Sequence, residues 1–600
     1  MGMKVSNRVL HDVTNWAGLV RECLFVDSGF CIRKLWLEAA CLILIAGNVS
    51  ARPGDPDDLL ATVERNVSAA SVSTNTAGNV VFDFGREAFG RLEIMAPEGS
   101  SGECVVRLGE LLDGAGGVNM HPGATIRSAE VRAAVVPGAW SRVPLVADKR
   151  NTSGGREGRA AQVRREHGVV MPFRYAEFVS APFALGPDSV RQVAVEYPVD
   201  RGASSFRCSD ERINRVYDFC RHSTIATTFA GLYVDGDRER IPYEGDAYIN
   251  QLCEYAVHSD YALARASHEY LMSHATWPTE WKQHSVMMAW TDWMWTGDKR
   301  SLERCYDGLK KDKLLDSCRR NDGLLHTGGR RSKDIVDWPV SERDGFEFRE
   351  VNAVVNAFYC RNLRQMADIA AALGKKDDAS FFAQRAEESE AAFRKTFFDE
   401  ARGVFVDGAG AHHASLHANA IALAFGLAPK GREGGVADFC VSRGMACSPY
   451  FAQYLLDGLF AAGRADAAIA LMTASGERSW LGMMEFGATI TMEAWSVRIK
   501  PNLDMNHAWG AAPINVISRH LLGVTPLEPG FAKISIRPSF GSLESASGVV
   551  PTAKGGVRVN YAAGVLHVET PAPARVEFAG KVHDIRAGAS GHFVNRRTGL

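Results

Sequence analysis

Five carboxylates and two arginines lie within the twelve residues DGDRERIPYEGD, from Asp235 to Asp246. Two glycines and a proline keep this segment from forming one regular helix, so we expect a bent connection between the helical patterns on either side. Carboxylates crowded beside cations on a rigid loop have pKa values that are pushed apart, so one can stay protonated while another is ionised. A solvated charged turn is the alternative, but apolar residues interrupt the charges and a helix-forming segment follows. The stretch therefore predicts the acid half of an acid–base site.

A second carboxylate that could work with this stretch is Glu493, in the sequence GATITMEAW from Gly487 to Trp495. This glutamate stands between small or β-branched residues and a tryptophan, which indicates a half-buried carboxylate. Cleavage of a glycosidic bond needs such a pair: one acid protonates the leaving oxygen, and a second carboxylate acts as nucleophile or as base for a water. The peptide by itself fits a helix-capping or salt-bridged glutamate slightly better.

Tryptophans gather in the same half of the chain as these carboxylates. Sugar rings have apolar C–H faces that stack on aromatic side chains, whereas their hydroxyls need charged or amide partners. Trp290 and Trp293 have helical spacing, which favours a position in the core. Asp337-Trp338-Pro339 is followed by ERDG and is predicted to lie on a loop, so Trp338 is the better platform for a sugar. The tryptophans in this region are Trp277, Trp281, Trp290, Trp293, Trp295, Trp338, Trp480 and Trp495.

The elements that must position these residues change type twice along the chain. Residues 52–205 contain short apolar runs separated by Gly/Pro/Ser clusters, which predict an N-terminal β-sandwich. Helical periodicity dominates residues 206–525, in alternating pairs that favour a toroid of helical hairpins. Residues 526–600 alternate again and predict a small C-terminal β-sandwich, while the basic stretch 149–165 is predicted to be an exposed loop. The helix candidates are Ala247–His274, Trp281–Trp295, Val351–Leu373, Ala379–Phe397, Ser415–Phe425, Tyr450–Ala461 and Ala465–Ser475.

The N-terminal 51 residues have the layout of a secretory signal peptide. Arg33-Lys34 precede an apolar run, Leu35 to Gly47, and Val49-Ser50-Ala51 supplies small residues after it. The run is too short to span a membrane, so we expect an exported protein with no membrane span. The segment before Arg33 is long and contains acidic residues, so a start site upstream of the true one and a buried core helix are the alternatives.

Composition excludes several other classes of function. The chain has 600 residues, 46% of them hydrophobic, and a net charge of −2, so a nucleic-acid partner is not expected. Its 12 cysteines show no CxxC pair and are read as small buried residues. His413 and His417 are spaced to face one side of a helix, but a pocket-lining role is favoured over metal binding. We predict no metal and no cofactor, and the oligomeric state stays open.

From about Ser209 to Thr552 the sequence resembles the α-L-rhamnosidases of glycoside hydrolase family 78. The resemblance rests on the Glu-Arg…Gly-Asp-Ala frame of the central stretch, the Gly-Ala-Thr…Glu…Trp motif and Asn506-His507-Ala-Trp-Gly, in the family's order. Pro526-Leu-Glu-Pro-Gly-Phe531 with Ile536-Arg-Pro538 resembles the family's closing module. The resemblance implies an (α/α)6 toroid, an inverting mechanism and release of terminal α-linked L-rhamnose from glycans or glycosides.

The resemblance also implies roles for single residues. Glu239 matches the general acid and Glu493 the general base that activates water. Many members have one more residue between the first aspartate and the acid, and a Cys-Pro pair after that aspartate, which puts the role of Asp235 in doubt. The positions that match substrate-binding residues are Asp235, Arg238, Tyr243 (where many members have tryptophan), Asp246, Asp337, Trp338, Trp480 and His507.

Two other functions remain open from the sequence. One is an (α/α)6 glycosidase of different sugar specificity, because loops and not the toroid select the sugar. The other is a non-catalytic carbohydrate-binding protein, against which the presence of both glutamates argues.

Overall fold

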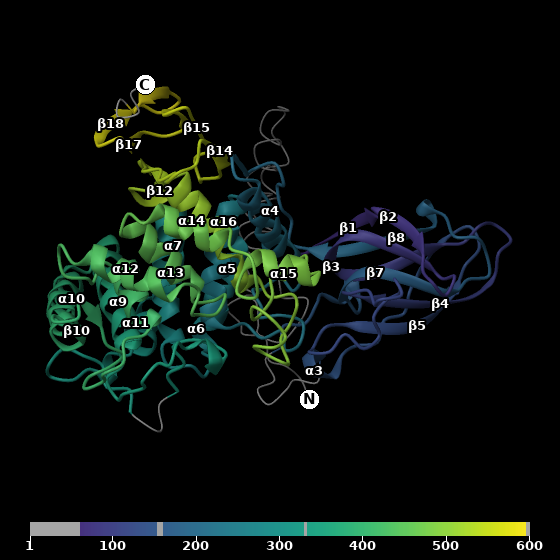
Figure 1. Ribbon diagram of the computed structural model, residues 1–600, viewed down its shortest axis with the longest axis horizontal. Coiled ribbons are helices and arrows are strands. Elements are labelled where there is room, and N and C mark those ends of the chain that lie inside the picture. The colour runs from purple at the N-terminus through teal and green to yellow at the C-terminus, as the bar shows by residue number, and fades with distance from the viewer. Residues whose placement is uncertain (1–59, 153–159, 329–332, 596–600) are drawn as a thin grey trace, which may run out of the picture. The chain divides into compact units, whose positions relative to one another are not determined.

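The structure, a computed structural model, describes residues 60–152, 160–328 and 333–595 (Figure 1). These residues all belong to one compact unit, Pro53–Leu600. The signal-peptide-like segment and residues 153–159 of the basic stretch lie outside the described residues. Of the rest of that stretch, Asn151 and Ala161 are buried, so the prediction of an exposed loop is wrong at these two positions.

The strands before residue 200 form one antiparallel sheet of eight strands in the described part of the chain. Its order is β1-β8-β3-β7-β4-β5, and β2 and β6 both pair with β3. The two apolar runs at 80–84 and 85–94 form a single long strand, in which the pairing register shifts between Asp83 and Ala88. The strands are β1 (Val63–Ser68), β2 (Ser71–Thr74), β3 (Val80–Met95), β4 (Gly102–Gly109), β5 (Ser128–Val135), β6 (Trp140–Arg142), β7 (Met171–Ser180) and β8 (Val190–Glu196).

Helices dominate the chain from residue 211 to 521, as predicted. Among the described helices the packing partners form a closed cycle, in which α5, α7, α9, α11, α13 and α16 each contact the next and α16 contacts α5. The helices are α4 (Glu211–Ala226), α5 (Glu244–Val257), α6 (Ala262–Ser273), α7 (Trp281–Thr296), α8 (Arg300–Gly308), α9 (Ala353–Ala372), α10 (Lys376–Phe397), α11 (Leu416–Ala424), α12 (Glu433–Arg443), α13 (Ala452–Ala461), α14 (Ala465–Met472), α15 (Trp480–Phe486) and α16 (Ala512–Val516).

The prediction of one helix over Ala247–His274 is wrong, because the chain forms α5 and α6 instead. His258 has extended backbone angles (φ −152°, ψ 175°) and ends α5. Asp260 then accepts a hydrogen bond from the N–H of Ala262, which favours a new helix start over continuation of the old helix.

The C-terminal strands form two sheets. One has the order β12-β13-β17-β18, and the other β19-β16-β15-β14-β9. The edge strand β9 (Ser205–Cys208) comes from the chain before the helices and pairs with β14. The other strands are β12 (Val524–Pro526), β13 (Ile534–Ile536), β14 (Ser545–Val550), β15 (Val557–Ala562), β16 (Val565–Glu569), β17 (Ala574–Phe578), β18 (Lys581–Ile585) and β19 (Ser590–Val594).

Three groups of buried apolar side chains bear on the placement of the site. The helices and the C-terminal sheets share one core, whereas β3, β4 and β7 enclose a separate core. A smaller cluster joins the two parts: Phe89 of β3 stacks on Phe229, with ring centroids 3.8 Å apart, and Val234 packs in the same cluster. The N-terminal sheet is therefore packed against the segment that leads directly into Asp235.

Candidate active site

The stretch Asp235–Asp246 folds as a closed turn that leads into α5. The N–H of Asp235 donates to the carbonyl of Ile241 (3.0 Å), and the N–H of Ile241 donates to the Asp235 carboxylate (2.9 Å). Arg240 has a positive φ of 53° and closes the turn by donating to the carbonyl of Gly236. Asp246 lies in the first turn of α5. The bent connection expected from the glycines and proline is confirmed.

Glu493 lies on the partner segment, which is held by backbone pairing. The N–H of Glu493 donates to the carbonyl of Asp504 (2.9 Å), and the N–H of Asp504 donates to the carboxylate of Glu493 (3.0 Å). Two cations also contact this carboxylate: Arg238 at 3.1 and 3.3 Å and Lys500 at 2.9 Å. The side chain is only 4% exposed, so the expected half-buried carboxylate is in fact buried and ion-paired.

Glu239 is more accessible, with a side chain that is 38% exposed. It accepts hydrogen bonds from Nε of Arg238 (3.4 Å) and from the hydroxyl of Tyr243 (3.2 Å). The Arg238 guanidinium therefore touches both glutamates. Because both carboxylates hydrogen-bond to this one guanidinium, they lie close together in space. The two glutamates are 254 positions apart in the sequence.

The environment of Glu493 stabilises its ionised form. Burial alone would raise the pKa of this carboxyl, but the nearby cations, Arg238 foremost, lower it to about 2. Burial lowers the pKa of His507 to about 3, so this imidazole is neutral near pH 7, and Arg238 and Lys500 are the cations that act on Glu493.

Two other carboxyls of the cluster, those of Asp504 and Asp235, have raised pKa values. Burial raises the pKa of Asp504 to about 7 even though Arg238 opposes the shift. Burial also raises the pKa of Asp235, with the charges of Glu239 and Asp504 adding to the effect. Neighbouring carboxyls thus differ in protonation state, which is the arrangement that acid–base chemistry requires.

Asp246 and His507 face each other in the same cluster. Oδ1 of Asp246 and Nδ1 of His507 are 3.5 Å apart, and neither atom has a hydrogen-bond partner among the described residues. Burial and the charge of Glu493 raise the pKa of Asp246 well above its ordinary value. Buried polar atoms without partners are costly, so the pair is suited to hydrogen-bond a polar ligand.

The remaining predicted contacts divide into a partly exposed and a buried group. Trp338 is partly exposed, as a stacking platform must be. The carboxylate of Asp337 is fully buried and accepts hydrogen bonds from Trp338, His417 and Ser448 at 2.8 to 2.9 Å. Trp480 is also fully buried, and its indole N–H donates to a carbonyl (2.7 Å). Neither Asp337 nor Trp480 presents a free polar atom or ring face, so their roles as sugar contacts stay predictions.

Sequence reasoning missed several residues that hold this cluster together. Lys500 and Asp504 bind Glu493, and Asp504 also accepts from the N–H of Arg238 (3.1 Å). A Cβ on Gly236 would lie 2.7 Å from the Asp504 carboxylate, so the close approach requires glycine there. The position of Lys500 and Asp504, between two motifs that were recognised, is the only signal that could have pointed to them.

The histidines considered for metal binding are occupied by carboxylates. His417 contacts Asp337 at 2.8 Å and His413 contacts Asp407 at 2.7 Å. No group of three or more potential metal ligands is present among the described residues. The helices that the structure describes also include none long and apolar enough to cross a membrane.

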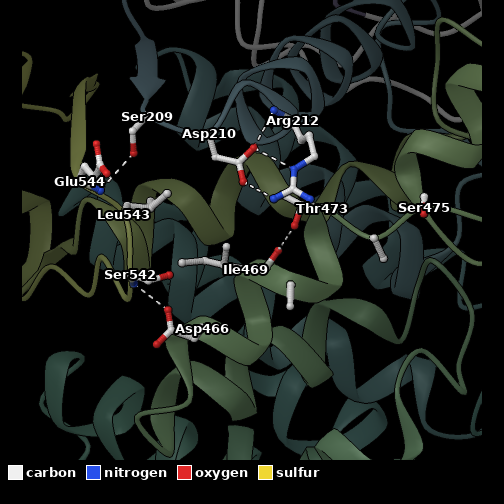
Figure 2. Close-up of a pocket in the computed structure, with 12 residues that line it drawn as sticks. Ser209, Asp210, Arg212, Asp466, Ile469, Thr473, Ser475, Ser542, Leu543 and Glu544 are labelled. Atoms are coloured by element: carbon white, nitrogen blue, oxygen red, sulfur yellow. Dashed lines mark hydrogen bonds and ion pairs between the residues drawn. The ribbon is translucent and has the colours of Figure 1, made fainter.

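A cavity of about 600 Å³ lies away from the predicted site (Figure 2). It is lined by the start of α4, by α14 and by residues 542–544, and Asp466 accepts a hydrogen bond from the N–H of Ser542 across it. None of the predicted site residues lines this cavity, so the cavity is not part of the predicted site.

Two families of known proteins match parts of this chain. The family described as bacterial alpha-L-rhamnosidase 6 hairpin glycosidase domain matches residues 201–521, and the family described as bacterial alpha-L-rhamnosidase C-terminal domain matches residues 523–579. A curated alpha-L-rhamnosidase of Alteromonas sp. (strain LOR) is 29% identical over 312 residues, which are 47% of this chain and 32% of that protein.

Solved structures of similar fold include two rhamnosidases. The alpha-L-rhamnosidase from Dictyoglumus thermophilum has a TM-score of 0.69 at 19% identity and is matched over 86% of this chain and 59% of its own. The enzyme from Aspergillus terreus has a TM-score of 0.71 at 18% identity, over 89% of this chain and 64% of its own. The match to the curated Alteromonas protein covers about a third of that protein's length. Since the first of these families covers more than half of its residues, the chain belongs to the bacterial α-L-rhamnosidase six-hairpin glycosidase family.

Proposed function

We propose that this protein is an inverting glycoside hydrolase that releases terminal α-linked L-rhamnose from an oligosaccharide or glycoside. Glu239 is the general acid and Glu493 the general base. The observation that carries the proposal is the contact of one guanidinium, that of Arg238, with both glutamates, one accessible and one buried and ionised. Family membership supports rhamnose as the sugar, and the named relatives are rhamnosidases.

The two glutamates have the different environments that their roles require. Glu239 is accessible to the glycosidic oxygen and hydrogen-bonded to Tyr243, so it can protonate the leaving group. Glu493 is ionised, so it can take a proton from the attacking water. Inverting enzymes hold the two carboxyls about 6.5–9.5 Å apart to admit that water, whereas retaining enzymes hold them about 5 Å apart. Both carboxylates bind the Arg238 guanidinium, and no contact between the two carboxylates is found among the described residues, which supports the inverting arrangement.

The sugar would lie between these glutamates and the uncharged polar pair of Asp246 and His507. Both residues have a free polar atom in the cluster, so they can bind sugar hydroxyls. Asp235, Arg238, Tyr243 and Trp338 complete the proposed binding residues, together with Asp337 and Trp480 in a supporting position.

The proposed fold is an (α/α)6 toroid, residues 206–525, between an N-terminal β-sandwich, 52–205, and a C-terminal β-sandwich, 526–600. The closed cycle of helix contacts from α5 to α16 supports the toroid, and the pair of C-terminal sheets supports the second sandwich. We also propose export directed by residues 1–51. The N-terminal sequence of the protein recovered from outside the cytoplasm tests this, and recovery of the uncleaved chain only from the cytoplasm would contradict it.

The anomer formed first from an aryl α-L-rhamnoside tests identity and mechanism together. Inversion gives β-L-rhamnose as the initial product, detectable by proton NMR before the anomers equilibrate. Initial release of the α-anomer would reject the inverting mechanism. Faster cleavage of aryl glucosides, galactosides or glucuronides would favour a different specificity. Binding of sugar without hydrolysis from about pH 4 to about pH 8 would identify a non-catalytic carbohydrate-binding protein.

The glutamate assignments are tested by Glu239→Gln and Glu493→Gln. Each variant should lose turnover by about 10²–10⁴-fold, because each removes a group that transfers a proton in the transition state. Melting temperatures should show that the fold is kept. Glu485→Gln, at an exposed position in α15, is the matched control and should keep full activity. Near-normal activity in either site variant would reject the assignment of that residue.

A further inference from the structure

Glu87 lies in an irregularity of strand β3 at the contact with the helical region. The residues 84–87 stand opposite a single residue of β7, since Asp83 pairs with Tyr175 and Ala88 with Phe173. Extra residues of this kind redirect side chains and often lie beside functional sites. The bulge is anchored on the helical side: the N–H of Glu87 donates to the Thr489 hydroxyl (2.8 Å), and its carbonyl hydrogen-bonds with Nε2 of His222 (2.7 Å).

The bulge brings the carboxyl of Glu87 to that of Glu110, which follows β4. Both side chains are buried, with residue exposures of 0% and 1%. Glu110 accepts hydrogen bonds from Nδ2 of Asn506 (2.8 Å) and from the N–H of Arg127. Both carboxyl oxygens of Glu87 are buried without a hydrogen-bond partner among the described residues, and after burial the Glu110 carboxyl is the largest cause of the raised pKa of Glu87. No ion pair to either carboxyl is found among the described residues. Two neighbouring buried carboxyls that form no ion pair favour a shared proton.

Asn506 connects Glu110 to the proposed active site, because it hydrogen-bonds to both. Its Oδ1 accepts the N–H of Asp237 (3.0 Å), the residue directly before Arg238 and Glu239. The Asp237 carboxylate is held in turn by Arg240 at 2.6 Å and by Arg127 at 3.4 Å. A continuous series of contacts therefore runs from the N-terminal sheet to the turn that carries the general acid.

We propose that Glu87 and Glu110 form a proton-sharing carboxyl pair, supplied by the N-terminal sheet, that positions Asn506 and through it the Asp237–Arg240 turn. Both are positioning residues, and neither contacts the sugar. The inference rests on the proposed function, since it assigns the pair to the loop of the proposed general acid.

Such a pair makes the turn sensitive to alkaline pH. Burial raises the pKa of Glu110 to about 8 and raises that of Glu87 well above its ordinary value, so the pair keeps a proton near pH 7. The charged groups that face the pair are Asp237, Arg127, Arg240 and, from β7, Arg174. His222 is the titratable neighbour from α4, and burial lowers its pKa to about 3, so it adds no positive charge.

The direction of the effect follows from these shifts. A carboxyl whose pKa is raised by folding contributes stability below its ordinary value of 4.5, and that contribution is lost as the pH rises through about 8. Above that pH the pair and Asp237 would be adjacent carboxylates that repel one another. Asn506 would then lose its fixed position, and both turnover and stability should fall.

Glu87→Gln and Glu110→Gln in the full chain distinguish positioning from a purely structural role. A glutamine at 87 donates to Glu110 without titrating, so turnover at about pH 6 should be kept and its fall above about pH 8 should disappear. A glutamine at 110 has only one acceptor oxygen, so its NH2 group faces one of the two donors, Asn506 or the N–H of Arg127, and that hydrogen bond is lost. Here kcat should fall by about tenfold to a hundredfold with KM little changed, because small displacements of a catalytic group are that costly.

The matched control is Glu177→Gln, in β7 of the same sheet. Glu177 is equally buried, but it accepts hydrogen bonds from Asn75, Asn79 and Val118, away from the site. This variant should lower the melting temperature and leave the pH profile of kcat unchanged.

Two results would overturn the proposal: a wild-type pH profile in Glu87→Gln, or a lowered melting temperature with unchanged kcat in Glu110→Gln. If the wild-type protein does not cleave rhamnosides at all, the proposed function has failed. The pair is then judged by melting temperature alone, which should fall from about pH 6 to about pH 9 in the wild type and less in Glu87→Gln. Equal falls in both proteins would reject the shared proton.

Discussion

Arg238 is the residue on which the electrostatics of the proposed site depend. Its guanidinium contacts Glu239 and Glu493 and also donates to the carbonyl of Asn502 (2.6 Å). Its side chain is only 15% exposed, so water screens these contacts weakly. A cation in this position favours the ionised form of the proposed base.

Arg238→Met tests this role through the pH dependence of kcat/KM. Without the guanidinium the ionised form of Glu493 loses its main stabilisation, so its pKa rises from about 2. The base works only when ionised, so the acidic limb of the profile should move up by about one pH unit or more. Lys500→Met should give a smaller shift in the same direction, because Lys500 donates one hydrogen bond to Glu493 whereas Arg238 donates two. Arg498→Met removes a side chain that is 79% exposed and should leave the limb in place. An unmoved limb in Arg238→Met would contradict the assignment of Glu493 as the base.

Sequence reasoning selected two glutamates that the folded chain brings to the same arginine, but it missed the residues that hold them there. Glu239 and Glu493 stand in motifs whose residue types predict a proton-transfer site. Lys500, Asp504 and Glu110 have no such local signal, since an isolated lysine or glutamate is most often solvated. Their partners lie on segments that are distant in the sequence, and only the folded chain shows those contacts.

At the scale of elements, α5 is positioned by a buried ion pair at its first residue. Nζ of Lys313 donates to the carbonyl of Leu271 at the end of α6 (2.7 Å) and lies 3.5 Å from the carboxylate of Glu244. Glu244 also accepts from the N–H of Thr276 (3.2 Å). The contacts fix the start of α5 against the end of α6, and Asp246 lies two residues after Glu244.

Lys313→Met should destabilise the protein by about 3–5 kcal/mol, because it leaves a carboxylate buried without its cation. Lys310→Met is the matched control from the same turn, Leu309–Lys313, and its side chain is 43% exposed. Loss of that surface pair should cost about 1 kcal/mol or less. Urea unfolding of the two variants measures the difference. Equal losses would mean that the pair does not fix the start of α5.

Helix periodicity predicted the long elements better than their ends. The predicted Ala379–Phe397 and Tyr450–Ala461 correspond to α10 and α13 within three residues at each end. Helices α8, α12, α15 and α16 were missed; they have 5 to 11 residues each, which gives little periodic pattern. The break between α5 and α6 was also missed, because apolar residues continue across it and the turn is set by the Asp260 side chain.

At the scale of the whole molecule, proximity in the sequence and proximity in space differ at the start of the helical region. The predicted domain boundary at residue 205 assigned residues 206–208 to the helical region. They form most of strand β9, which instead completes the C-terminal sheet by pairing with β14, so the two ends of the helical region meet. The composition of a four-residue strand cannot reveal a partner more than 300 residues away, since pairing depends on the whole fold.

The N-terminal sheet has its own core and still reaches the proposed site. Thr125 donates to the carbonyl of Leu503, beside Asp504, and Glu110 binds Asn506. Nothing in the strand pattern of residues 52–205 indicated such contacts. The sheet is therefore part of the site's support and not a separate appendage.

The shared core of helices and C-terminal strands predicts that these parts unfold together. Phe206 of β9 is 1% exposed and packs on Tyr217 of α4, with ring centroids 5.4 Å apart. Phe206→Ala should cost about 3–5 kcal/mol, because it removes a fully buried ring that joins the sheet to the helix. Val594→Ala, on β19 of the same sheet, is the control; Val594 is 58% exposed, so the change should stay within about 0.5 kcal/mol.

Urea unfolding of Phe206→Ala should be followed by far-UV circular dichroism for the helices and by hydrogen exchange for the C-terminal strands. Both signals should shift to lower urea by the same free energy, because one core supports both parts. Loss of exchange protection in the strands alone, with the helices unchanged, would show that the C-terminal sheets are an independent unit. In that case the edge strand contributed by residues 205–208 would not couple the two ends of the helical region.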